Sequence, residues 1–341
     1  MAARRGDTLL FPTPPVVAAH AAIGGKKEGE GPLAACFDAL SADNFFGQSS
    51  WEAAERELAL RTAQLCLKKA QTTPEKVSLV LAGDLQAQCT ASGYAMRELG
   101  IPFAGLFGAC STMAEALGLG AALCSAGMAD GLLAMTSSHF CAAERQFRTP
   151  LSYGAVRTPT AQWTATAAGA CLLRPAGEGV QLCAVTFGRV QDYKIKDINN
   201  MGAAMAPAAA ATLLHYLKDT GSAPEDFDRI YTGDLGHVGS QLLRDLLAAE
   251  GLLLKNHVDC GCILYDAAEQ TVKSGGSGPG CCASVLCGHI LPRLERGTRK
   301  RVLFIATGAL MSQTTFLQKE SIPAIAHLVE LRSPQQKEEN G

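Results

Sequence analysis

Cys110 is the residue whose type and setting best fit chemistry. It follows an apolar segment and a tight turn, and Thr112 with Glu115 has capping-box spacing, which predicts a helix directly behind the cysteine. The stretch 101–127 is almost all small or apolar, so this helix is expected to be buried. A helix start favours a thiolate and lowers the thiol pKa. The segment therefore predicts a nucleophile or an anion site, with Ser111 beside Cys110.

A structural interpretation of Cys110 is also open. The chain has 13 cysteines, and buried cysteine often only fills space. The cysteines are scattered through apolar segments, which favours a reducing compartment over a disulfide framework. Zinc is not expected, because Cys260-Gly-Cys262 and Cys281-Cys282 lack paired metal spacing.

The segment 141–166 has the composition of a pocket for a flat anion. Arginines, including Arg148 and Arg157, alternate there with aromatic residues that include Trp163. Guanidinium groups form forked hydrogen bonds to carboxylates, and aromatic rings stack on planar ligands. The alternative is a surface loop over the sheet. His139, at the end of an expected strand, is likewise either a donor to a ligand or a structural histidine.

Size and charge limit the functional classes. The chain has 341 residues, 48% hydrophobic and 18% charged, which suits one large domain or two fused ones. A net charge of −2 gives no nucleic-acid footprint. We find no signal peptide, and the uncharged run 116–129 is too short to span a bilayer. We expect a soluble protein, or one bound peripherally to a membrane.

Alternating strands and helices are predicted along the whole chain. Residues 1–35 form an extended lead, Ser49 with Glu52 caps the next helix, and the polar tail 333–341 is disordered. Strands 166–173 and 180–188 are expected to form a hairpin. The other strands are expected in the run after Pro102 and at 76–82, 130–136, 227–232 and, as the last one, 301–306. Helices are expected at 51–70, 91–99, 112–127, 199–218, 281–294 and, after the segment 236–239, up to residue 250.

One block of elements recurs. Residues 77–85, 108–117 and 130–138 match 227–235, 278–287 and 300–309 in order and type. Such a duplication predicts two pseudo-equivalent halves, 1–175 and 176–332. Apolar strands alternating with helices predict parallel-type sheets, packed through buried helices into a sheet–helix–sheet arrangement.

A duplicated α/β block with a cysteine at the head of a buried helix resembles the thiolase superfamily, which includes the ketoacyl synthases. The resemblance implies an α/β fold layered α-β-α-β-α and an acyl-accepting Cys110. It also implies a second-half histidine and asparagine. Here Asp234 stands nearest the histidine position, with His237 three residues on, and Ser277 replaces the asparagine. These departures speak against condensation, which needs such donors.

Several motifs resemble, more closely, the family of stage V sporulation AD proteins. They are KKEGEGP (26–32), SWEAAE (50–55), LAGDL (81–85), IPFAGLFGACSTM (101–113), SSHF (137–140) and NMGAAMAPAA (200–209). The family implies a dipicolinate-binding subunit of a spore inner-membrane complex that takes dipicolinic acid, usually with calcium, into the forespore and releases it in germination. The implied partners are dipicolinate, integral membrane subunits and a second copy in a homodimer, with no cofactor or resident metal.

Three functions follow, in order of preference. The first is a non-catalytic dipicolinate-binding subunit, the second an acyltransferase using Cys110, and the third a structural scaffold of the membrane complex. For the first, the resemblance and the residues together predict a ligand site formed by Cys110, Ser111, His139, Arg148, Arg157, Trp163, Asp234, His237 and Ser277.

Overall fold

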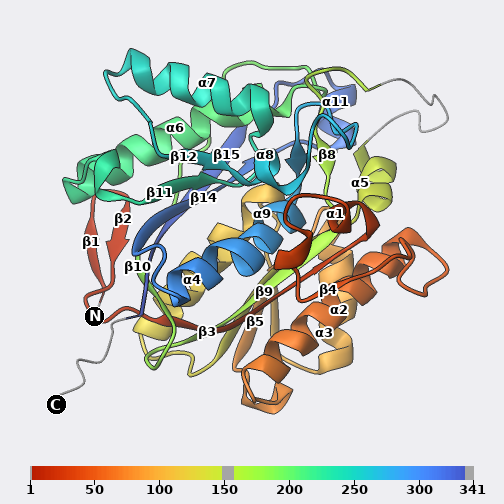
Figure 1. The fold of residues 1–341 in the computed structure, drawn as a ribbon, viewed down its shortest axis with the longest axis vertical. Coiled ribbons are helices and arrows are strands. Elements are labelled where there is room, and N and C mark those ends of the chain that lie inside the picture. Colours follow the sequence, from red (N-terminus) through yellow and green to blue (C-terminus); the bar gives the residue numbers. More distant parts are fainter. Residues whose placement is uncertain (1, 148–156, 335–341) are drawn as a thin grey trace.

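A computed structural model describes residues 2–147 and 157–334. Its dominant feature is a large β-sheet (Figure 1). Ten of its strands are hydrogen-bonded side by side in the order β12-β11-β14-β15-β10-β3-β9-β7-β5-β6. The first half contributes β3 (Val16–Gly24), β5 (Leu79–Gly83), β6 (Phe103–Gly105), β7 (Leu132–Ser138) and β9 (Ala167–Arg174). The second contributes β10 (Val180–Thr186), β11 (Arg229–Thr232), β12 (His257–Asp259), β14 (Arg301–Ala309) and β15 (Ala324–Arg332).

The two sets of five strands have the same topology. In each set the first strand in sequence lies at the centre of this order, followed outward by the fifth, fourth, second and third. The fifth strands, β9 and β15, run antiparallel to their neighbours, whereas the outer strands are parallel. Short antiparallel pairing of β3 with β10 joins the sets. The predicted duplication of strands and helices is therefore confirmed, with mixed rather than purely parallel sheets.

Helices complete the five layers. Helices α4 (Thr112–Ser125) and α9 (Pro279–Val285) lie between the two sets of strands (Figure 1). Their apolar side chains form one core with strands of both halves. Helices α2 (Trp51–Lys69) and α3 (Thr90–Leu99) cover the outside of the first set. Helices α6 (Met201–Thr220) and α7 (Gly236–Ala249) cover the second.

Further short strands and helices precede or lie between these elements. The strands are β1 (Ala3–Arg5), β2 (Thr8–Leu10), β4 (Ala39–Leu40), β8 (Trp163–Thr164) and β13 (Gly276–Ser277). The helices are α1 (Lys26–Gly29), α5 (Phe140–Phe147), α8 (Cys260–Leu264), α10 (Leu291–Glu295) and α11 (Gln313–Leu317), with a π-helical turn at Leu286–Ile290. That turn joins α9 to α10.

Several strand predictions are wrong. The expected extended lead contains β3, a buried strand at the centre of the sheet. The strand predicted as the last is followed by the equally buried β15. β9 and β10 do not form a hairpin, because β3 lies between them. β6, expected to be buried, is a largely exposed edge strand.

Both predicted capping boxes are also wrong. Thr112 is the first residue of α4 rather than its cap, and its hydroxyl donates to the Ala109 carbonyl at 2.7 Å. Helix α2 is capped one residue later than predicted, by Ser50, whose hydroxyl accepts from the Ala53 amide at 3.2 Å. The predicted tail at 333–341 lies almost wholly outside the described residues.

Candidate functional site

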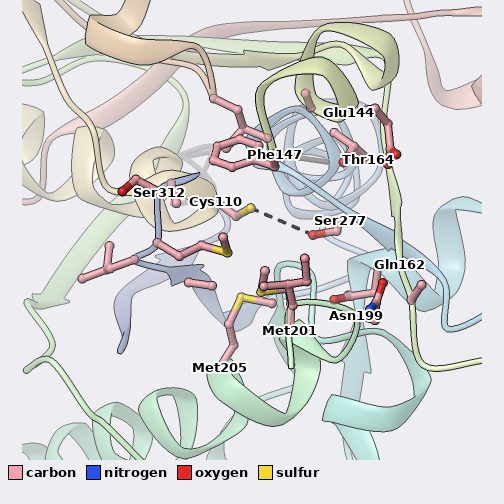
Figure 2. Close-up of a pocket in the computed structure, with 18 of the residues that line it drawn as sticks. Cys110, Glu144, Phe147, Gln162, Thr164, Asn199, Met201, Met205, Ser277 and Ser312 are labelled. Atoms are coloured by element: carbon pink, nitrogen blue, oxygen red, sulfur yellow. Dashed lines mark hydrogen bonds between the residues drawn. The ribbon is translucent and has the colours of Figure 1, made fainter. Parts of the chain in front are cut away.

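A cavity of about 430 Å³ opens where the carboxyl ends of β5 and β14 approach the start of α6. Parallel strands of an α/β sheet commonly present their functional residues at this edge. Cys110 and Ser277 lie together at the wall of the cavity, with Phe147 and the two methionines of α6 around it (Figure 2). The other lining residues include Leu85, Phe107, Glu144, Arg157, Gln162, Thr164, Asn199, Met311, Ser312 and Thr315.

Cys110 lies on a strained turn at the entrance to α4. The preceding Ala109 has φ +51°, a left-handed conformation that is costly for a residue with a side chain. Cys110 is only 8% exposed, and its Sγ lies 4.0 Å from the Ser277 hydroxyl oxygen. The turn therefore places a cysteine from the first half against a serine from the second.

Asp234 lies buried behind this pair, directly after β11. Its carboxylate accepts hydrogen bonds from the Thr307 hydroxyl at 2.6 Å and the Ser277 hydroxyl at 3.2 Å. Burial raises the pKa of Asp234 to about 6, although hydrogen bonds from Cys110 and Thr307 oppose the rise. Near neutral pH this carboxylate is mostly ionised, so it places negative charge beside the thiol.

The predicted lowering of the Cys110 pKa is wrong. Burial raises the pKa of the Cys110 thiol well above its usual value, and the Asp234 charge adds to the rise. Both effects oppose a thiolate, since burial and a nearby negative charge each disfavour the anion. Cys110 is also separated from Thr112, the first residue of α4, by Ser111, so it lies just outside the helix start.

Arg157 brings a positive charge to the lining of the cavity. Its Nη1 donates to Glu144 Oε1 at 2.7 Å, and its Nη2 donates to the Gln162 carbonyl. The guanidinium carbon lies 5.4 Å from the Phe140 ring centre and 5.5 Å from that of Trp163. These two rings stack with centres 3.7 Å apart, so the predicted combination of arginine and aromatic rings is present.

Five of the predicted ligand residues within the described chain do not line the cavity, and three of them, Ser111, His139 and His237, make their contacts elsewhere. The Ser111 hydroxyl donates to the Gly108 carbonyl at 2.6 Å. His139 Nε2 bonds the Asn44 carbonyl at 2.8 Å, which fits the structural alternative for this histidine. His237 is exposed on the first turn of α7, where its amide donates to Ser274.

The remaining predicted residues divide as follows. Cys110, Ser277 and Arg157 line the cavity, Asp234 lies behind Cys110, and Trp163 supports Arg157. Arg148 falls outside the described residues, directly after Phe147 in the sequence.

Sequence reasoning missed most of the apolar wall. Met201 and Met205 extend from the first turns of α6 into the cavity (Figure 2). Their i, i+4 spacing directly after the capping Asn200 is the signal that could have identified them. The sequence gives no sign of Thr307, whose hydroxyl donates to Asp234, because the two residues are far apart in the chain.

Neither a metal cluster nor a membrane helix is found in the described ranges. Within residues 2–147 and 157–334, no group of three or more histidines, cysteines or acids could hold a metal ion. No helix of that same part of the chain combines the length and apolar character needed to cross a membrane.

Solved structures of other proteins share this architecture. The chain is similar to 3-oxoacyl-[acyl-carrier-protein] synthase III from Aquifex aeolicus VF5, with 12% identity, a TM-score of 0.56, and 93% of this chain and 99% of that one covered. It is also similar to cerulenin-bound OleA from Xanthomonas campestris, with 15% identity, a TM-score of 0.62, and coverage of 97% and 99%. The fold is thus that of the thiolase-like condensing enzymes.

Sequence comparison defines the family more narrowly. The family model for stage V sporulation protein AD matches residues 5–332. Stage V sporulation protein AD of Bacillus subtilis (strain 168) is 42% identical over 322 residues, covering 94% of this chain and 95% of that protein. The chain belongs to the stage V sporulation protein AD family, which assigns it a role in stage V of sporulation.

Proposed function

We propose that the chain is a non-catalytic subunit that binds dipicolinic acid in the Cys110 cavity, as part of the spore membrane complex that loads the forespore. The observation that carries the proposal is Arg157, a half-buried guanidinium beside stacked aromatic rings at a cavity of about 430 Å³. Dipicolinate is flat, aromatic and doubly anionic. A guanidinium fork recognises a carboxylate, and the apolar wall suits the ring.

The ion pair between Arg157 and Glu144 suggests how calcium would strengthen the binding of dipicolinate. A ligand carboxylate that engages Arg157 competes with Glu144 for the same guanidinium. The displaced carboxylate is an oxygen ligand of the kind that Ca²⁺ prefers. A calcium–dipicolinate chelate would therefore match the wall better than dipicolinate alone, and we expect calcium to increase the affinity.

The surroundings of Cys110 favour binding over catalysis. A cysteine nucleophile acts as the thiolate, and here burial and Asp234 both raise the pKa of the thiol. Among the described residues that line the cavity there is no histidine to take its proton. Cys110 then serves as part of the wall.

Calorimetric titration of the full chain with dipicolinate, with and without calcium, tests this proposal. We expect saturable binding that weakens at least about tenfold in Arg157→Gln and is partly retained in Arg157→Lys. Arg145→Gln is the matched control, because Arg145 lies on neighbouring α5 but pairs with Glu52 and does not line the cavity. Isophthalate, which lacks the chelating ring nitrogen, should lose the calcium effect. No binding to the wild type contradicts the proposal.

Acyl transfer through Cys110 is the second candidate, favoured by the position of this thiol at the cavity wall. Incubation with acyl-CoA thioesters followed by intact-protein mass spectrometry separates the two functions. We expect no acyl adduct on the wild type. An adduct that disappears in Cys110→Ser would instead support an enzyme.

A further inference from the structure

A second hollow, of about 470 Å³, lies near the amino ends of β11 and β14. It is lined by Arg229, the first residue of β11, and by Arg299, two residues before β14. The Cys110 cavity lies beyond the carboxyl ends of these strands, and the two hollows share no lining residue. The other lining residues are Pro32, Leu33, Tyr231, Val258, Cys262, Ile263, His289 and Arg293.

Three arginines line this hollow: Arg229 on β11, Arg293 on α10 and Arg299 in the loop before β14. Burial raises the pKa of the Tyr231 phenol, and the charges of Arg299, Arg293 and Arg229 all oppose that rise, so each arginine acts on the same point. Like charges gathered around one hollow repel each other unless an anion lies between them. The three positive charges therefore repel one another, and a bound anion would reduce this repulsion.

No carboxylate of the described residues forms a direct ion pair with this cluster. The nearby Asp228 carboxylate accepts instead from the backbone amides of Lys300 at 2.5 Å and Arg301 at 3.0 Å. Burial opposes the shift, but these hydrogen bonds and the charges of Arg299 and Arg229 lower the pKa of Asp228, so this carboxylate offsets part of their charge without a direct ion pair. The remaining positive charge and the unused guanidinium donors are available to an external anion.

Each arginine is anchored but keeps donors to spare. Arg229 and Arg299 each donate Nη1 to a backbone carbonyl, of Asp228 at 2.7 Å and of Thr298 at 2.9 Å. The Nε of Arg299 is shielded from solvent and finds no acceptor among the described residues. Anchored guanidinium groups are pre-organised, which lowers the entropy lost on binding.

His289 adds a further donor. Its Nδ1 lies 2.9 Å from Arg293 Nη1, and a guanidinium only donates, so Nδ1 accepts and the ring proton is on Nε2. Burial, together with Arg293, Arg299 and Arg296, lowers the pKa of His289 to about 4, which keeps the ring neutral near pH 7. The hollow thus combines three cations with a neutral N–H donor.

We infer that this hollow binds a phosphate-bearing anion. A single carboxylate would leave most of the positive charge unpaired, whereas a phosphate group carries about −1.5 to −2 and three acceptor oxygens. Arginine forks match such oxygens in pairs. A free phosphate compound and the headgroup of an anionic lipid share this chemistry.

Titration of the full chain with inorganic phosphate and pyrophosphate, at constant ionic strength, tests the inference for free ligands. Flotation with phosphatidylglycerol vesicles, against phosphatidylcholine vesicles, tests the lipid source. In at least one arm we expect wild-type binding that falls about tenfold or more in Arg299→Gln and in Arg293→Gln. Arg296→Gln is the matched control: it removes the same charge from an exposed residue that does not line the hollow, and should change binding less than about threefold.

The inference is overturned if the wild type binds neither phosphate, pyrophosphate nor anionic vesicles. It is equally overturned if Arg296→Gln weakens binding as much as Arg299→Gln, because net charge alone would then explain the effect. Arg299→Lys and a thermal melt of each variant show whether a loss reflects misfolding. Dipicolinate binding should be unchanged in Arg299→Gln, so that this inference and the proposed function can fail separately.

Discussion

At the scale of single residues, the contact between Cys110 and Asp234 decides what the cavity can do. Asp234 adds its charge to the effect of burial and raises the pKa of the Cys110 thiol. Asp234→Asn removes that charge, so the pKa of Cys110 should fall and the thiol should be alkylated several-fold faster at pH 8. The measurement is the rate of iodoacetamide labelling of Cys110, followed by peptide mass spectrometry.

Thr307→Val is the control for this prediction. It removes the hydroxyl that donates to Asp234 at 2.6 Å but leaves the carboxylate charge in place. Labelling of Cys110 should remain slow in this variant. Fast labelling of Cys110 in the wild type would contradict the raised pKa of its thiol. It would favour acyl transfer as the function.

The sequence predicts only some of the residues that form the cavity. Cys110 was predicted at the head of a buried helix because strand, turn and helix are local signals. The histidines were misplaced because the direction of a side chain depends on tertiary packing: His139 turns to the Asn44 carbonyl, and His237 lies on the exposed side of α7. The replacement of the asparagine by Ser277 was visible in the sequence, but its contact with Cys110 across 167 residues was not.

At the scale of elements, α2 is held to the sheet by a buried acid. Glu55 on α2 accepts from Gln86 at 2.9 Å and from Ser137 of β7 at 3.1 Å. Burial and the neighbouring Asp84 raise the pKa of Glu55 to about 8. In the unfolded chain the pKa of this carboxyl is about 4.3. Between the two pKa values, Glu55 therefore keeps its proton in the folded chain and loses it in the unfolded chain.

The sign of the pH dependence follows from this difference in proton binding. Because the folded state binds more protons, the free energy of unfolding falls as pH rises between the two pKa values. Asp234 and Asp259 have pKa values raised to about 6, so between about pH 6.5 and 8 Glu55 is the main contributor of the three. Glu55→Gln should flatten this fall and stabilise the protein at pH 8 by roughly 1 kcal/mol or more.

Urea unfolding at pH 6.5 and 8 measures this effect. Glu57→Gln on the same helix is the control, since Glu57 pairs with Arg61 at the surface and should leave the pH dependence unchanged. Equal slopes in the wild type and Glu55→Gln would show that Glu55 is ionised in the folded protein.

The sequence predicts the strands that are marked by a local apolar run. It does not predict which distant strands pair in the sheet. The repeated strands β5, β7, β11 and β14 are short apolar runs bounded by turns, and their positions were predicted. β3 is rich in alanine and follows three prolines, so it resembled an extended lead. β9 and β10 are adjacent in sequence, but β3 separates them, a pairing that no local pattern encodes.

At the scale of the whole molecule, the two halves are expected to unfold together. Their main core contains side chains of α4 from the first half and α9 from the second, with strands of both. The packing is close enough that glycine is required. A Cβ on Gly169 of β9 would lie 2.3 Å from the Ala283 carbonyl oxygen of α9.

Gly169→Ala should therefore force α9 away from β9. Because the obstacle is backbone, we expect a loss of about 1–3 kcal/mol in the free energy of unfolding, the usual cost of overpacking. Gly93→Ala is the matched control: Gly93 lies within α3 with no atom nearer than 3.9 Å to the added Cβ, so the change should be neutral or stabilising by up to about 1 kcal/mol.

Calorimetry distinguishes a shared core from two independent ones. With a shared core, the wild type and Gly169→Ala each show one cooperative transition, at a lower temperature in the variant. Since the cavity wall joins Cys110 of one half to Ser277 of the other, the same variant should also weaken any ligand bound there. Two separate transitions in the wild type would mean that the halves hold together through the β3–β10 pairing alone, and that the site can open without unfolding either half.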